Sequence, residues 1–597
     1  MAVDTIPLRL QNQGRQNSDR IAYRVRESNG TWTSTNYGEY ARQVHDAAKA
    51  MIGLGFEPGQ KACILGFNRP EWVIADVATM MAGGVPAGIY TTCSATEVQY
   101  IIDHADAPIV FLENEGQWDK VVAERDNLPK LKYAVMMKGS KVADDPLAMS
   151  WEEFLAKGEG VEDSAVEARL EGLKADESAT FIYTSGTTGP PKAVMLSHKN
   201  LTFTADVAVE IVGLSSGDHN LSYLPLSHIA EQMFSLHGPI TAATYISFAE
   251  SIEKVPDNLK EVQPTIVFGV PRIWEKMHAK VGTSLAAATG VKKRLVDFAI
   301  STGNDVVALR NQGKEPAGLL AFKYRIANKL IFSKVKPLMG LSNARVCVSG
   351  AAPIAKEVLQ FFAGLDLTIH EVYGQSEDTG PTSFNTPGRT RYGTVGPAVP
   401  GVEVKIADDG EILVRGDNVF LGYYKNQEAT DETLIDGWLY SGDLGEFDGD
   451  GFLKITGRKK EIIITAGGKN IAPKNIEGAL KNLPLVSQAV VIGDRRKFLS
   501  ALITLDPEAL EAFAADKGLK GDLHKNELVI REIQAGIDES VNPQFARVEH
   551  VRKFTLLHRD FQVDTNDRGK AELTPTLKIK RKIVNDNFAD EIEGMYV

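Results

Sequence analysis

Residues 181–198, FIYTSGTTGPPKAVMLSH, combine glycines, hydroxyl residues and one lysine in a spacing suited to binding phosphate. Gly186 and Gly189 permit tight turns in which backbone N–H groups converge on an anion. Lys192 adds a positive charge. The hydroxyl donors of the segment are Thr184, Ser185, Thr187 and Thr188. Because two prolines precede the lysine and a strand pattern follows it, this is not a Walker A loop. A glycine-rich hairpin turn without a ligand is the alternative.

Two later segments carry residues suited to a nucleotide and a metal ion. One strand-like run ends in Gly350, Ala351 and Ala352, small residues that let a flat ring approach the backbone, although a plain tight turn has the same composition. The other segment, EVYGQSE, places a carboxylate close to an aromatic ring and a hydroxyl, and carboxylate oxygen suits Mg²⁺ bound together with phosphate. Its candidate residues are Tyr373, Gly374, Ser376 and Glu377.

Charged residues mark two further segments nearer the C-terminus. Residues 436–460 contain Asp443 and Arg458, which a hairpin with a surface salt bridge would also explain. Residues 573–582, LTPTLKIKRK, contain Lys578 in a basic stretch, and such stretches are usually solvated or bind nucleic acid.

Alternating helical and strand patterns position these segments. Residues 36–53 and 71–82 have helical spacing, and residues 62–66 and 107–112 read as buried strands. The alternation predicts an α/β fold with a parallel sheet flanked by helices. Strands at 181–183 and 193–196 bracket the phosphate-binding candidate, and the polar residues 141–174 read as a surface connection.

The totals limit the class of protein. A chain of 597 residues is too long for one core, and 43% hydrophobic with 24% charged residues is typical of a soluble globular protein. The net charge of −12 argues against nucleic acid as a partner. Three scattered cysteines indicate no disulfide framework, which fits a cytoplasmic protein. The N-terminus lacks signal-peptide features, and glycines and a proline break the uncharged run 77–96, which argues against a membrane span.

Residues 286–341 are helical, locally basic and amphipathic. Such a segment can lie on an anionic membrane, although a solvated helical face is the commoner case. Peripheral contact with the inner membrane surface therefore stays open, as does a homodimer.

The order of these motifs resembles that of the acyl-adenylate-forming enzymes. The blocks ITAGGKN, IGDRRKFLSALITL, HRDF and LTPTLKIKR are most similar to the bubblegum-type long-chain fatty acyl-CoA synthetases. The resemblance implies a large N-terminal adenylation domain of several subdomains (1–457) and a small mobile α+β C-terminal domain (458–597). Lys460 takes the hinge position between them.

The resemblance also implies nucleotide and metal contacts. The loop from Thr184 to Gly189 would hold the phosphates of ATP, and Tyr373 would stack on adenine beside the turn at Gly350. Thr184 and Glu377 would hold Mg²⁺. The remaining implied contacts are Ser376 with phosphate, Gly374 with the acyl pocket, and Asp443 and Arg458 with ribose.

Lysine and gate residues complete the implied site. Lys578 would reach the α-phosphate and the acyl carboxylate, and Lys192 would also stabilise charge. His228 would gate the carboxylate pocket and Trp274 the acyl tunnel, although a structural histidine and a core tryptophan are the ordinary alternatives. The pair Gly467 and Gly468 would let the pantetheine arm of CoA pass, unless the pair is a simple turn.

The implied activity is that of an AMP-forming long-chain fatty acid–CoA ligase. Its substrates would be a long-chain fatty acid, ATP and CoA, with Mg²⁺ as metal. This sequence departs from the family pattern at Ser376 and Ser441, where threonine is usual, and at Leu577, where glycine is usual. Two alternatives stay open, a fatty acyl-AMP ligase that loads a carrier protein and an inactive lipid-binding scaffold.

Overall fold

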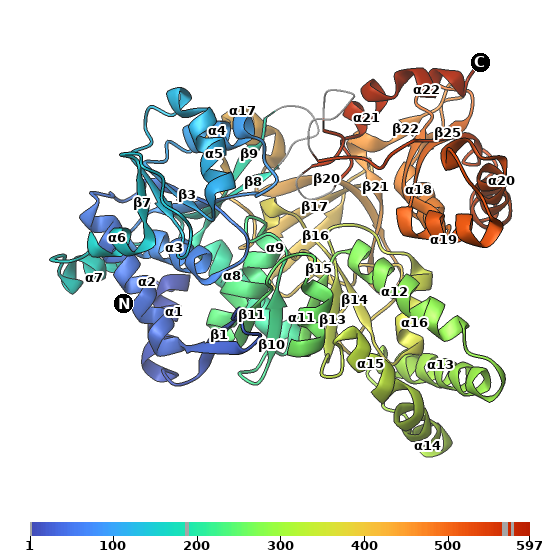
Figure 1. Ribbon diagram of the computed structural model, residues 1–597, viewed down its shortest axis with the longest axis horizontal. Coiled ribbons are helices and arrows are strands. Elements are labelled where there is room, and N and C mark those ends of the chain that lie inside the picture. The colour runs from blue at the N-terminus through green and yellow to red at the C-terminus, as the bar shows by residue number, and fades with distance from the viewer. Residues whose placement is uncertain (1–2, 185–189, 564–570, 575–577) are drawn as a thin grey trace.

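The phosphate-binding candidate lies near one edge of an eight-stranded sheet in the computed structural model, which describes residues 3–184, 190–563, 571–574 and 578–597 (Figure 1). Strands from β8 across to β7 pair in parallel, whereas β9 and β18 run antiparallel to their neighbours. The predicted strands around the loop are confirmed. In sheet order the strands are β18 Gly422–Tyr423, β9 Lys192–Ser197, β8 Ser178–Thr184, β4 Val85–Ile89, β3 Lys61–Leu65, β5 Ile109–Leu112, β6 Tyr133–Met136 and β7 Ala148–Ser150.

Several helices of the first half begin at residues whose side chains accept from the free N–H groups of the first turn. The side chain of Asn36 accepts from Glu39 N–H at the start of α2, and Ser94 and Glu97 cap α4 reciprocally. The helices are α1 Ile6–Gln16, α2 Tyr37–Gly53, α3 Pro70–Met81, α4 Ala95–His104, α5 Glu115–Ala123, α6 Trp151–Ala156, α7 Asp163–Glu171, α8 His198–Val212, α9 Ile229–Gln232, α10 Gly238–Ala242 and α11 Val255–Val262.

The prediction for residues 141–174 is wrong in part. Ser150 and Glu153 form a capping box that starts α6, and Trp151 and Phe154 pack on Phe111 of the sheet. Their spacing of three residues places both aromatic rings on one helical face. The polar composition of the segment concealed this contact with the core.

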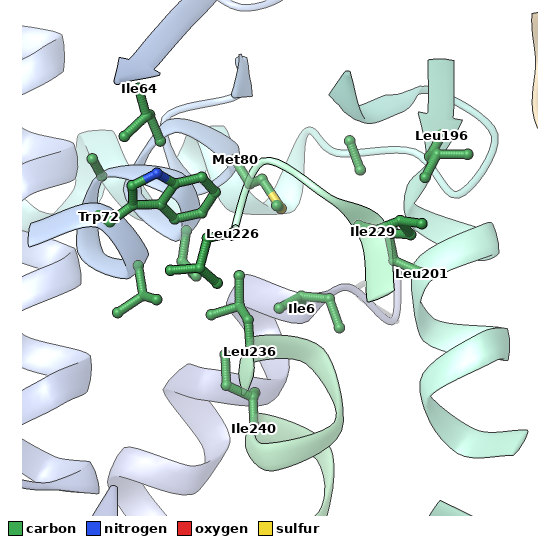
Figure 2. Close-up of a cluster of buried hydrophobic side chains, with 14 of the residues drawn as sticks. Ile6, Ile64, Trp72, Met80, Leu196, Leu201, Leu226, Ile229, Leu236 and Ile240 are labelled. Atoms are coloured by element: carbon green, nitrogen blue, oxygen red, sulfur yellow. The ribbon is translucent and has the colours of Figure 1, made fainter. Parts of the chain in front are cut away.

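The main core lies between the large sheet and the helices that flank it. Figure 2 shows Trp72 of α3 beside Ile64 of β3, with Ile6, Leu226 and Leu236 in the same cluster. Among the described residues, no helix combines the length and apolar character needed to span a bilayer.

Three smaller sheets are built mainly from strands in the middle of the chain, and one of them also contains β1 and β2 from near the N-terminus. The sheet β10-β11-β1-β2 is mixed, β12-β13-β14 is parallel with β15 antiparallel, and β16-β17-β20 is antiparallel with β19 and β21 both beside β20. Their bounds are β1 Ile21–Arg26, β2 Trp32–Asn36, β10 His219–Ser222, β11 Tyr245–Phe248, β12 Ile266–Gly269, β13 Val346–Ser349, β14 Ile369–Tyr373, β15 Ser383–Phe384, β16 Val402–Ile406, β17 Glu411–Gly416, β19 Leu434–Ile435, β20 Trp438–Phe447 and β21 Leu453–Arg458.

Helices α12 to α17 accompany these sheets. Helices α12 to α15 lie between β12 and β13, and α13 to α15 confirm the helical region predicted at residues 286–341 (Figure 1). The bounds are α12 Pro271–Ala286, α13 Gly290–Arg310, α14 Gly318–Ala327, α15 Ser333–Met339, α16 Lys356–Gly364 and α17 Gln427–Thr433.

The end of the chain forms its own hydrophobic clusters, whose members all lie between residues 463 and 596. The division into domains at 457 and 458 stays a prediction. The strands in this last part of the chain are β22 Ile463–Ile464, β23 Asn470–Ile471, β24 Val486–Ile492, β25 Leu499–Leu505 and β26 Val551–Leu556. Its helices are α18 Pro473–Lys481, α19 Pro507–Lys517, α20 Glu527–Gly536, α21 Arg581–Asn587 and α22 Ala589–Gly594.

Candidate active site

Two antiparallel strands hold both ends of the phosphate-binding candidate. Thr184, the last residue of β8, pairs with Lys192, the first residue of β9, and the Thr184 hydroxyl donates to the Lys192 carbonyl at 3.5 Å. The hairpin therefore fixes where the loop leaves and re-enters the sheet. The predicted loop residues Ser185, Gly186, Thr187, Thr188 and Gly189 lie outside the described residues.

Tyr423 connects the loop lysine to the predicted metal carboxylate. Lys192 Nζ lies 4.7 Å from the centroid of the Tyr423 ring, and the Tyr423 hydroxyl donates to Glu377 Oε1 at 2.8 Å. Burial and the charge of Glu377 raise the pKa of Tyr423, so its hydroxyl remains a donor. Tyr423 could not be recognised from the sequence, because only the pairing of β18 with β9, opposite Val194, brings it here.

The donors near Glu377 fit a magnesium ion that phosphate completes. Mg²⁺ in nucleotide sites is commonly bound by one or two carboxylates together with phosphate oxygens. Among the described residues, no group of three or more His, Cys, Asp or Glu side chains is arranged to hold a metal. Glu377 is a half-buried carboxylate oriented by the Tyr423 hydroxyl, which suits a site where protein and phosphate oxygens together bind Mg²⁺.

Replacing Tyr423 with phenylalanine is expected to raise the Mg²⁺ concentration for half-maximal activity at least about tenfold, because Glu377 loses the donor that orients it. The ring beneath Lys192 is retained in this variant. The measurement is the Mg²⁺ dependence of pyrophosphate release. The neighbouring Tyr424→Phe, whose hydroxyl contacts Lys61 and Asp106, is the control and should keep the wild-type dependence. The same Mg²⁺ dependence in Tyr423→Phe would remove Tyr423 from this role.

Asp443 lies at the centre of a second group of predicted residues. Its Oδ2 accepts from the Tyr373 hydroxyl at 3.0 Å, and its Oδ1 accepts from Arg458 Nε at 2.8 Å. Asp443 and Arg458 face each other across β20 and β21, so strand register fixes their pairing. The Asp443 charge raises the pKa of Arg458. The pKa of Tyr373 is raised mainly by burial and further by the Asp443 charge. Both groups therefore keep their protons.

Glu411 is a buried carboxylate that sequence reasoning missed. Its Oε1 accepts from Gly442 N–H at 2.8 Å, and its Oε2 accepts from Lys459 Nζ at 2.8 Å. It thereby ties Gly442, the residue before Asp443 in β20, to the residue preceding the predicted hinge, Lys460. Lys460 itself is exposed in the 3₁₀ turn Lys459–Glu461. The only signal in the sequence was the position of Glu411 directly after Asp408, Asp409 and Gly410, a composition typical of a hairpin turn.

Lys578, from the end of the chain, lies within electrostatic range of both Glu377 and Asp443. Desolvation, Arg458 and Lys474 lower its pKa to about 8, against the opposing effects of Asp443 and Glu377. Lys578 keeps part of its surface exposed to solvent, although many protein atoms surround it. Its backbone N–H donates to Thr574 Oγ1 at 3.0 Å. The structure thus brings this lysine to the predicted nucleotide residues.

His228 is a neutral donor in the same region. Burial and the positive charge of Lys578 lower the pKa of His228 to about 3. Its Nδ1 accepts from Ala230 N–H at 3.1 Å at the start of α9, which assigns the ring proton to Nε2. His228 can therefore donate one hydrogen bond but carries no charge at neutral pH.

Small residues near the predicted adenine turn are required by backbone packing. A Cβ on Gly374 would lie 1.4 Å from the Gly380 carbonyl oxygen, and one on Gly350 would lie 2.5 Å from Val372 Cγ1. Ala351 has a φ of +67°, in the left-handed region, and Ala351 and Ala352 are exposed. Ser376 is buried at the start of the 3₁₀ turn Ser376–Asp378.

Trp274 has the surroundings of a core residue. Its side chain is fully buried, its Nε1 donates to the carbonyls of Gly269 at 3.1 Å and Val348 at 3.3 Å, and its ring packs edge-on against Phe362. These contacts support the core alternative, and the gate role stays a prediction.

The glycine pair 467–468 occupies the exposed turn between β22 and β23, where Gly468 has a φ of +72°. No hydrogen bond or ion pair among the described residues joins this turn to Glu377, Asp443 or Lys578. Its role toward CoA stays a prediction.

Two family models cover most of the chain. One, described as “AMP-binding enzyme”, matches residues 10–424, and the other, “AMP-binding enzyme C-terminal domain”, matches residues 460–597. The chain belongs to the AMP-binding enzyme family, with a large N-terminal and a smaller C-terminal part, and the expected fold class is confirmed.

Relatives include long-chain-fatty-acid–CoA ligases of the bubblegum group, as the sequence resemblance predicts. ACSBG2 of Xenopus laevis is 38% identical over 600 residues, covering 95% of this chain and 80% of that protein. FadD15 of Mycobacterium tuberculosis, also a long-chain-fatty-acid–CoA ligase by name, is 37% identical over 603 residues, covering 99% and 97%.

Solved structures with low sequence identity share the fold. The anthranilate CoA ligase AuaEII in complex with anthranoyl-AMP matches with a TM-score of 0.70 at 20% identity, covering 98% of this chain and 97% of that one. ATP-bound MatB from Rhodopseudomonas palustris matches with a TM-score of 0.68 at 21% identity, covering 98% and 100%.

Proposed function

We propose that this protein is an AMP-forming long-chain fatty acid–CoA ligase. The observation that carries the proposal is the position of Lys578, which couples electrostatically to Glu377, Asp443 and His228. Relatives named for that activity align along nearly the whole chain, which supports the choice of substrate.

In the first step a fatty carboxylate oxygen attacks the α-phosphorus of ATP. The bond from that phosphorus to the pyrophosphate oxygen breaks, giving acyl-AMP and pyrophosphate. Lys578 would offset the charge at the attacked phosphate and Lys192 that on the leaving pyrophosphate, while the Nε2 proton of His228 would orient the carboxylate. Glu377 would hold Mg²⁺, which screens the phosphate charges.

Asp443 would fix the nucleotide during this step. Its oxygens would accept the ribose hydroxyls, and Arg458 and Tyr373 hold the carboxylate in place by donating to it. In the second step the CoA sulfur attacks the acyl carbonyl, the thiol proton is lost and AMP leaves. No protein nucleophile is needed, because the mixed anhydride is already activated.

The test is pyrophosphate release with ATP and Mg²⁺ across a series of fatty acids, with and without CoA. Release that rises with CoA, peaks at long chains and yields acyl-CoA is the expected result. Release without acyl-CoA would indicate transfer to a carrier protein and contradict the ligase proposal. No release with any fatty acid would contradict the proposed acyl substrate.

The alkaline side of the pH profile is expected to report Lys578. Its charge is present below its pKa of about 8 and is lost as the pH rises through that value. We therefore expect kcat/KM for ATP to fall above about pH 8, approaching tenfold per pH unit, since this parameter reports the free enzyme. In Lys578→Arg the charge no longer titrates, so a lower rate without this decline is expected. The same decline in both proteins would assign it to another group.

A further inference from the structure

Residues 318–339 form a helical arm made of α14, the π-helical turn Asn328–Phe332 and α15. In Figure 1 the end of the arm at α14 projects from the lower edge of the molecule, next to α13. One side of the arm is held against α13, because Ala327 and Phe332 are buried together with Ala299. The α14 end of the arm is therefore packed against α13 on one side.

The outer side of the arm carries apolar side chains that are mostly exposed in the part of the chain that the structure describes. Leu319, Phe322 and Leu338 are 68%, 59% and 70% exposed. Residues three and four apart share a helical face, so Leu319 and Phe322 continue into the half-buried Ile326 and Leu330. Single exposed apolar residues are ordinary, but two on the projecting helix α14, continued by half-buried apolar neighbours and joined by Leu338 on α15, indicate an interaction surface.

The charge of the arm is entirely positive. Residues 318–339 include no Asp or Glu, although the whole chain has a net charge of −12. Lys336 is paired with Asp366 at 2.7 Å. The other basic residues are exposed, and no salt bridge between described residues engages them: Lys323, Arg325, Lys329 and Lys334.

The exposed apolar side chains and the positive charge of the arm together indicate what kind of surface binds to it. A second copy of the arm would bring like charges together, which opposes self-association. An anionic bilayer complements both features, because apolar side chains enter the boundary between headgroups and acyl chains while lysine side chains extend to the phosphates.

We propose that the outer side of the arm docks the protein peripherally on anionic phospholipid bilayers. The apolar contacts are Leu319, Phe322 and Leu338, and the lysines at 323, 329 and 334 flank them. Docking itself requires neither ATP nor catalysis, so it stands apart from the proposed activity.

The arm is also joined to the helix that carries Trp274. Met339 and the half-buried Val335 of α15 belong to the same hydrophobic cluster as Trp274 and Phe362. A protein held at the bilayer by the arm would therefore present this helical region to the membrane, the phase in which a long-chain fatty acid dissolves.

The test is flotation of the full-length protein with vesicles of phosphatidylcholine alone or mixed with phosphatidylglycerol. Binding to the mixed vesicles, weakened by added salt, is expected. The triple variant Lys323→Glu, Lys329→Glu, Lys334→Glu is expected to lower the partition coefficient about 100-fold or more. The triple variant Leu319→Ser, Phe322→Ser, Leu338→Ser is expected to lower it at least about tenfold.

A matched control separates the effect of the arm's lysines from the effect of a change in the net charge of the protein. The variant Lys517→Glu, Lys520→Glu, Lys525→Glu makes the same charge change at exposed positions beyond the arm and should bind as the wild type does. Thermal melting checks that each variant is folded. Equal loss of binding in the control, wild-type binding by either arm variant, or no binding of the wild type to mixed vesicles would each overturn the proposal.

Discussion

Replacing Lys578 with alanine is expected to slow acyl-adenylate formation by about 10²–10³-fold, because the transition state loses one preorganised positive charge. Transfer of the acyl group from preformed acyl-AMP to CoA should keep most of its rate, since no phosphorus is attacked in that step. The measurements are fatty-acid-dependent pyrophosphate release and, separately, acyl-CoA formation from synthetic acyl-AMP.

Lys582→Ala is the matched control for this prediction. Lys582 is an exposed lysine in α21, four residues further along, and its replacement should leave both half-reactions unchanged. Equal loss of both half-reactions in Lys578→Ala would mean that this lysine is not specific to the first step. An unchanged adenylation rate would remove it from the site altogether.

The strands that frame the site were predictable from the sequence. The apolar runs at 181–183 and 193–196 are short and bounded by turn residues, and the structure places β8 and β9 there. The pairing of Asp443 with Arg458 was also within reach, because both residues belong to one hairpin and strand register sets their distance.

The contacts between distant segments could not be predicted from local sequence patterns. Tyr423 reaches Glu377 only because β18 joins the large sheet beside β9, and a two-residue strand leaves no periodic signal. Glu411 is buried, and its carboxylate is satisfied by donors from Gly442 and Lys459, which lie 31 and 48 residues away in the chain. The position of Lys578 beside Glu377 and Asp443 was implied by the family resemblance alone, because no local pattern encodes how the end of the chain packs on the rest.

Gly374 shows how backbone packing adds to a residue's implied role. The family resemblance places this glycine beside the acyl pocket, whereas the structure shows that a Cβ here would lie 1.4 Å from the Gly380 carbonyl oxygen. Gly380 N–H donates to the Gln375 carbonyl at 3.0 Å, and Thr382 N–H donates to the Tyr373 carbonyl at 2.8 Å. The segment that carries Ser376 and Glu377 is thus folded tightly back on itself.

Replacing Gly374 with alanine is therefore expected to displace Glu377 and slow adenylation about 100-fold, since a shift of about 1 Å in a positioning group has this effect. Overpacking should also lower the stability by about 1–3 kcal/mol. Gly449→Ala, at an exposed glycine where a Cβ meets nothing within 4 Å, is the control and should change neither quantity.

The chain-length dependence of the Gly374→Ala rates separates the two explanations of this glycine. If the backbone collision dominates, adenylation of short and long fatty acids falls by the same factor, because the displaced group is the carboxylate of Glu377. If the methyl group instead narrows an acyl pocket, long acids are rejected while short acids react at the wild-type rate. We expect the first result, since at 1.4 Å the Gly380 carbonyl must move before any ligand enters.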